Sequence, residues 1–129
     1  MKKNILLLTV IVLMTGLLKA ESLLLAKDRV AFYTIVTGEN AIPSEIFAAE
    51  ELSNILQKIS SAKFQIISEN NLDNVSAKRI YVGWTQFAEK QGYNLSAFST
   101  DEWLISTQDD QLLICGGRPR GTLYAAYEL

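Results

Sequence analysis

The sequence contains no histidine, one cysteine and two prolines, and aromatic residues make up only 9% of the chain. Without histidine, the protein lacks the usual general base at neutral pH, the base of Ser-His-Asp and Cys-His sites, and the commonest zinc ligand. A single cysteine, Cys115, excludes an intramolecular disulfide bond. Because it lies in an apolar run, we interpret Cys115 as a small buried side chain rather than a reactive thiol. We therefore expect no cofactor and no metal, since a metal site would have to be built from carboxylates alone.

The N-terminus has the pattern of a bacterial secretory signal peptide. Lys2 and Lys3 precede an apolar run over residues 5–18, about fourteen residues long. This run is shorter than the roughly 20 residues needed to cross a bilayer, which favours a cleaved signal over a membrane anchor. We therefore predict a signal peptide at residues 1–20, a secreted or periplasmic protein, and no stable membrane insertion after cleavage.

Once residues 1–20 are removed, the chain is acidic. Nine basic and 14 acidic residues remain, for a net charge of −5. An acidic surface repels phosphate backbones and anionic lipids, so we expect neither nucleic acid nor an anionic membrane as a partner. Three adjacent carboxylate pairs are interpreted as solvated surface or turn residues rather than catalytic pairs: Glu50-Glu51, Asp101-Glu102 and Asp109-Asp110. On a helix, for example, adjacent side chains point about 100° apart and cannot act together across a substrate.

Hydrophobic periodicity predicts alternating strands and helices. The clearest signal is an apolar stripe at three- and four-residue spacing up to Ile59, which predicts a helix opened by Pro43 and Glu45. The last two strands are joined by a short polar turn and form an antiparallel hairpin. Strands are predicted at residues 30–36, 64–67, 79–83, 102–107 and 111–115, and further helices at 84–91 and from about 121. The pattern predicts an α+β fold (an α/β sandwich) with a mixed, largely antiparallel sheet of about five strands and flanking helices.

The last eighteen residues, 112–129, carry the most specific pattern of the chain. The strand at 112–115 is apolar on both faces, so we expect it to be central and covered on both sides. Glycines then allow a sharp strand-to-helix turn, and no Gly-Lys-Ser/Thr follows that would make it a phosphate loop. We interpret Arg118 and Arg120 as candidate salt-bridge contacts to a neighbouring domain. Because the final helix reaches Leu129 without a C-cap glycine or a basic last turn, we expect the domain to be truncated there.

Trp84, Tyr93 and Trp103 are candidate platforms for stacking a sugar ring. Trp103 sits in a predicted strand and is interpreted as a core residue, whereas Trp84 follows a strand end at Gly83 and could be exposed. Glycan binding through these aromatic residues is therefore kept as an alternative to a purely structural role.

Four segments resemble a known accessory domain: residues 47–52, 80–83, 103–105 and, above all, 113–129. They are similar to the N-terminal domain of family 67 alpha-glucuronidases, to the related domain before the barrel of family 20 beta-N-acetylhexosaminidases, and to large secreted bacterial proteins of unassigned activity. The resemblance covers residues 31–129. It implies a hexosaminidase domain 2-like mixed sheet in front of a (β/α)₈ barrel that carries the catalytic carboxylates. No catalytic residue is therefore carried onto this chain.

We accordingly predict an alpha-glucuronidase N-terminal-like domain at residues 28–129, non-catalytic by itself. It would support a downstream barrel in cis, in a secreted glycoside hydrolase acting on polysaccharide-derived glycans. The alternative is a stand-alone secreted module that binds a carbohydrate or a protein. An independent enzyme is the weakest hypothesis, because no histidine and no convincing carboxylate pair is present. The residues of the structural turn and of possible interdomain contacts are Gly116, Gly117, Arg118, Arg120, Gly121 and Tyr124.

Overall fold

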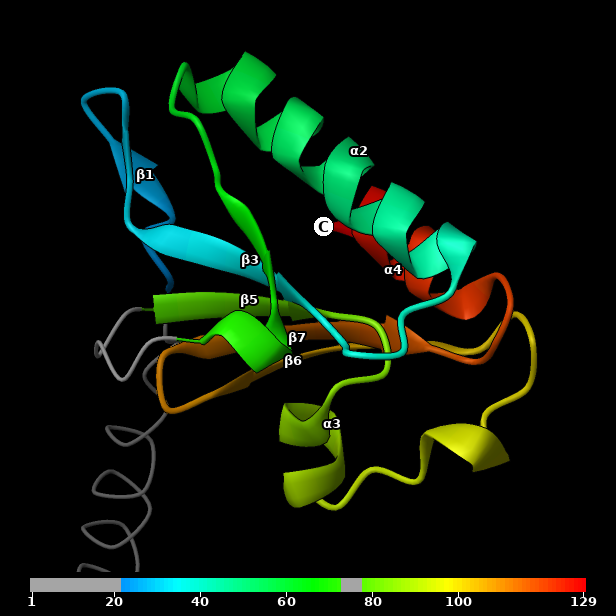
Figure 1. Ribbon diagram of the computed structural model, residues 1–129. Coiled ribbons are helices and arrows are strands. Elements are labelled where there is room, and N and C mark those ends of the chain that lie inside the picture. The colour runs from blue at the N-terminus through cyan, green and yellow to red at the C-terminus, as the bar shows by residue number, and fades with distance from the viewer. Residues whose placement is uncertain (1–21, 73–77) are drawn as a thin grey trace, which may run out of the picture.

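The computed structural model describes residues 22–72 and 78–129 (Figure 1). The predicted signal peptide lies outside the described residues. Within the two described segments, no helix combines the length and the hydrophobicity needed to cross a bilayer. The elements follow in the order β1 (Ala26–Lys27), β2 (Val30–Ala31), β3 (Tyr33–Thr37), α2 (Pro43–Ser60), β4 (Ile66–Ser68), β5 (Lys78–Val82), α3 (Gln86–Lys90), β6 (Trp103–Gln108), β7 (Gln111–Gly116) and α4 (Gly121–Glu128), with short 3₁₀ turns at Glu69–Asn71 and Leu95–Ala97.

The main sheet has five strands in the order β4-β3-β5-β7-β6. The predicted α+β class and the mixed five-stranded sheet with flanking helices are confirmed. The prediction that the sheet is largely antiparallel was wrong, because most of its strand pairs are parallel. Strand β3 pairs in parallel with β4 and β5, β5 pairs in parallel with β7, and only β6 and β7 are antiparallel. Two strands joined by a tight turn must pair antiparallel, and in the main sheet this applies only to β6 and β7. The other neighbouring strands are connected by helices or long loops, which allow the chain to return in the same direction.

Helices cover both faces of this sheet, as Figure 1 shows: α2 and α4 lie on one face and α3 on the other. One buried cluster joins α2 and α4 to the sheet through Leu52, Ala125 and Ile114. A second cluster on the opposite face includes Ala88 of α3 and Leu113 of β7. The sheet is therefore the middle layer of a three-layer arrangement.

Strand β7 lies inside the sheet, between β5 and β6, and contributes to both cores. Leu112 and Ile114 belong to the cluster under α2 and α4, whereas Leu113 and Cys115 belong to the cluster under α3. All four side chains are buried. This confirms the expectation that an apolar strand without alternation is covered on both faces.

Two predictions about individual strands were wrong. The strand expected over residues 30–36 is divided, because a small hairpin of β1 and β2 turns through Asp28 and Arg29, both with positive φ. Trp103 is not a core residue, since 43% of it is exposed. It lies on β6, the outermost strand of the sheet, and an outer strand has a neighbour on one side only.

Candidate functional site

A pocket of about 320 Å³ lies beyond the carboxyl ends of β3 and β5. The chain leaves β3 through α2 on one face of the sheet and leaves β5 through α3 on the other face. Two adjacent parallel strands whose connections diverge in this way leave a crevice between their loops, which is where open α/β sheets bind ligands. The pocket is lined by Glu39, Asn40, Glu69, Trp84, Thr85, Gln86, Glu89 and Arg118.

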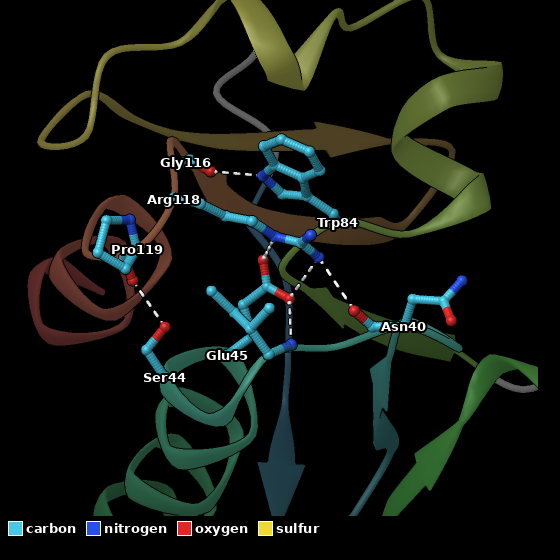
Figure 2. Close-up of polar contacts among 8 residues, drawn as sticks. Asn40, Ser44, Glu45, Trp84, Gly116, Arg118 and Pro119 are labelled. Carbon is cyan, nitrogen blue, oxygen red and sulfur yellow. Dashed lines mark hydrogen bonds and ion pairs between the residues drawn. The ribbon is translucent and has the colours of Figure 1, made fainter.

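One side of this pocket is built on a partly buried ion pair between Arg118 and Glu45 (Figure 2). The guanidinium donates from Nε to Glu45 Oε1 at 3.0 Å and from Nη2 to Oε2 at 3.1 Å, which is the bidentate geometry that planar groups favour. The Nη2 group also donates to the Asn40 carbonyl at 3.1 Å. Arg118 comes from the loop after β7 and Glu45 from the first turn of α2, so the pair joins two distant parts of the chain.

The Arg118 guanidinium also stacks on Trp84. Its central carbon lies 4.1 Å from the centroid of the indole ring, within the range of a cation–π contact. The indole is held in turn, because its Nε1 donates to the Gly116 carbonyl at 2.8 Å. Trp84 therefore has a fixed orientation before any ligand arrives.

Glu45 can be buried at this point because the neighbouring residue is Gly83. The Glu45 side chain is 1% exposed, and a Cβ on Gly83 would lie 3.0 Å from its Cγ and Cδ atoms. Gly83 also has φ +87°, a conformation that other residues rarely adopt. The Ile42 backbone N–H donates a third hydrogen bond to the Glu45 carboxylate at 3.1 Å. The buried charge is thus fully paired, as burial requires.

The opposite side of the pocket is held together by Glu69. Its carboxylate accepts the Glu39 backbone N–H at 3.0 Å and the Gln86 backbone N–H at 2.8 Å. The Glu39 amide belongs to the loop after β3, and the Gln86 amide belongs to the first residue of α3, directly after the loop that follows β5. Glu69 therefore links the two segments that form the pocket. Thr85 fixes the start of α3 beside the pocket, because its Oγ1 accepts the Ala88 N–H at 3.2 Å and caps the helix.

Comparison with known protein families matches the model described as Glycosyl hydrolase family 67 N-terminus to residues 20–129. The chain belongs to this family. The resemblance noted in the sequence is therefore confirmed for the family 67 N-terminal domain. A search of curated protein sequences found no significant match.

In this family 67 domain, the turn after β7 is packed closely against the loop before β6. A Cβ added to Gly117 would overlap the Ser99 carbonyl, and one added to Gly116 or Gly121 would overlap the Glu102 carbonyl. The Arg118–Pro119 peptide bond within this turn is cis. The structure thus gives all three glycines a packing role in the strand-to-helix turn.

The two arginines of this turn have partners inside the domain. Arg118 pairs with Glu45, and Arg120 Nε lies 2.9 Å from Asp101 Oδ1 in a pair whose side chains are both more than half exposed. Tyr124 is 40% exposed on α4. Their contact with a neighbouring domain stays a prediction.

Of the three candidate stacking residues, only Trp84 lines the pocket. Tyr93 is half-buried in the cluster under α3, with its hydroxyl 3.4 Å from Ser106 Oγ, and Trp103 lies on β6. The carboxylates of the pocket were not predicted. Glu39, Glu69 and Glu89 follow the ends of three different strands, β3, β4 and β5, which the sequence did not show to be neighbours.

Cys115 is buried in the family 67 domain, as expected. Burial, and secondarily the negative charge of Glu45, raise the pKa of the Cys115 thiol to about 12. The thiol therefore carries its proton at physiological pH. Across residues 22–72 and 78–129, no three cysteine or acidic side chains are grouped so that they could hold a metal ion.

Proposed function

We propose that this chain is the non-catalytic N-terminal domain of a secreted family 67 glycoside hydrolase that acts on polysaccharide-derived glycans. The observation that carries the proposal is the family match over residues 20–129, because a family 67 N-terminus implies an accompanying catalytic domain in the parent protein. The domain would support a downstream (β/α)₈ barrel in the same polypeptide.

The polar contacts at the pocket support a structural rather than a catalytic role for two carboxylates, Glu69 in its lining and Glu45 beneath Arg118. Glu45 is paired with Arg118 and accepts the Ile42 amide, and Glu69 accepts two backbone amides. A general acid or base must exchange a proton with a substrate within hydrogen-bond reach. Both carboxylates instead use their lone pairs to join loops.

The outer side of the helical layer supports an interdomain contact. Phe47 and Ile59 of α2, and Tyr124 and Tyr127 of α4, are between 40% and 78% exposed. Large apolar and aromatic side chains that are exposed on one layer offer an interaction surface. We propose that the barrel contacts this layer beside Arg120, so that the predicted interdomain residues lie at the edge of an apolar contact.

Activity assays on the purified chain test the non-catalytic part of this proposal. Aryl glucuronides, aryl N-acetylglucosaminides and xylan-derived oligosaccharides should give no turnover above a heat-denatured control. Robust turnover on any of them would overturn it. Sequencing of the coding DNA beyond the Leu129 codon at the native locus tests the second part, because the proposal requires a barrel domain in the same reading frame.

A second candidate function is a secreted glycan-binding module, and the pocket beside Trp84 is the observation that favours it. This function does not require a catalytic partner. Calorimetric titration of the purified chain with a panel of oligosaccharides would show saturable heat if it is correct, and no heat with any member if it is not.

A further inference from the structure

The pocket between β3 and β5 is formed before a ligand binds. Glu69 links its two loops through backbone amides, and the Arg118–Glu45 pair joins the loop after β7 to α2. Trp84 is held between the Arg118 guanidinium and its hydrogen bond to Gly116. A site whose walls are already ordered loses little conformational entropy when it binds, which favours recognition of a small polar ligand.

The polar groups of this pocket are mostly hydrogen-bond acceptors. Glu39 and Glu89 are exposed, and their carboxylates form no hydrogen bond or ion pair with other residues in the described part of the chain. Carboxylates accept only, whereas the side-chain amides of Asn40 and Gln86 both donate and accept. Neighbouring hydroxyl groups of a sugar are donors and acceptors, and they match this set.

The pocket carries a net negative charge. Its lining includes three carboxylates, on Glu39, Glu69 and Glu89, and one guanidinium, on Arg118, for a net charge of −2. The Arg118 charge is already balanced by Glu45 at 3.0 Å. A negatively charged ligand would meet three carboxylates and no unbalanced cation among the lining residues, so it would be repelled.

We infer that this pocket binds a saccharide unit that carries no carboxylate, and that it discriminates against uronic acids. The inference rests on the proposed association of this domain with glycans, which makes a sugar the ligand class, but it does not depend on a downstream barrel. Trp84 and the amides supply contacts to the sugar, and Glu39 and Glu89 supply both hydrogen bonds to hydroxyls and the repulsion of an acid.

Fluorescence of Trp84 offers a direct test. The chain has two tryptophans, and Trp103→Phe removes the other one from an exposed position on β6. The full chain with this substitution is titrated with methyl β-glucoside and methyl β-glucuronide, which differ only in a hydroxymethyl group and a carboxylate. We expect the glucoside to change Trp84 emission saturably, and the glucuronide to bind about tenfold more weakly at low ionic strength.

Variants that remove carboxylates test whether Glu39 and Glu89 cause the weaker binding of the glucuronide. In the Glu39→Gln/Glu89→Gln double variant, the glucuronide should approach the affinity of the glucoside, because the repulsion falls while the shape is kept. Glu50→Gln, an exposed position on α2 away from the pocket, is the matched control and should leave the tenfold difference in place. Circular dichroism spectra verify that each variant is folded.

Two results would overturn the inference: no change of Trp84 emission with the glucoside at millimolar concentration, or a glucuronide affinity equal to or above that of the glucoside in the parent chain. Neither result bears on whether a catalytic barrel follows the domain. Conversely, a reading frame without a barrel would leave the sugar titration unaffected, so the two proposals fail separately.

Discussion

Removing Arg118 from its ion pair with Glu45 should destabilise the domain strongly, because it leaves a buried carboxylate without its partner, and Arg118→Met tests this. The substitution keeps the apolar stem of the side chain but removes both hydrogen bonds to a carboxylate that is only 1% exposed. A buried charge left without its partner costs about 3–5 kcal/mol. Because the Arg118 side chain is itself 30% exposed, water can partly replace it, and we expect a loss of about 3 kcal/mol, the low end of that range.

The second ion pair of the same turn provides the matched control. Arg120 and Asp101 lie 2.9 Å apart, almost the same distance as Arg118 and Glu45, but their side chains are 56% and 60% exposed. An exposed pair contributes about 0–1 kcal/mol, so Arg120→Met should change the free energy of unfolding by about 0.5 kcal/mol or less. Urea denaturation of the parent chain and both variants gives the comparison. For a domain of this size, the loss at Arg118 corresponds to a fall in Tm of roughly 15 °C.

A double-mutant cycle separates the ion pair from other effects of the substitutions. Glu45→Gln and Arg118→Met should show a coupling energy of at least about 1 kcal/mol, because the two side chains contact each other directly. Equal effects of Arg118→Met and Arg120→Met would refute the reasoning, since distance alone would then determine the contribution of each pair. A coupling energy near zero would also refute it.

Three further predictions concern the backbone and the buried thiol. Gly83→Ala should destabilise the domain by at least about 1 kcal/mol more than Gly92→Ala in urea denaturation, because both have φ near +90° but only Gly83 has Glu45 within 3.0 Å of the added methyl. Asp110→Gly should raise the free energy of unfolding by about 0.5–1 kcal/mol, and with it the Tm by a few degrees, because the φ of 64° at this position of the hairpin turn suits glycine. A lower Tm would contradict this. Cys115 should not react with a thiol reagent at pH 8 until the chain unfolds. Because its pKa is raised to about 12 in the folded state, its contribution to stability is present below pH 9 and is lost as the pH rises towards 12, so Cys115→Ala should reduce alkaline unfolding.

The elements that the sequence predicted well are those defined by local patterns. The long helix begins at Pro43, as expected, and ends at Ser60, one residue beyond the predicted apolar stripe. The last hairpin turns at Asp109 and Asp110, whose positive φ values suit the tight turn that the polar residues indicated. Periodicity and turn chemistry depend on neighbouring residues alone, so they can be read before the fold is known.

The pocket could not be predicted in the same way, because its parts are far apart in the chain. Arg118 and Glu45 are 73 positions apart, and no local pattern indicates that they meet. From the sequence, Glu45 was assigned a role in opening the helix and Arg118 a role at an interdomain contact. Only the parallel pairing of β3, β5 and β7 brings the ends of these strands, and the loops that follow them, to one edge of the sheet.

The main helix and the hairpin could be inferred from the sequence alone, because each depends on residue patterns within a short segment. The family and the α+β class could be inferred as well, because they depend on the order of such patterns along residues 20–129. Tertiary structure decided the strand order, the exposure of Trp103 at the sheet edge, and the burial of Glu45 against Gly83. These features depend on which faces of the sheet the helices cover and on which loops then meet. The physical reason is that packing is non-local: a side chain is buried or exposed according to neighbours that the chain brings from elsewhere.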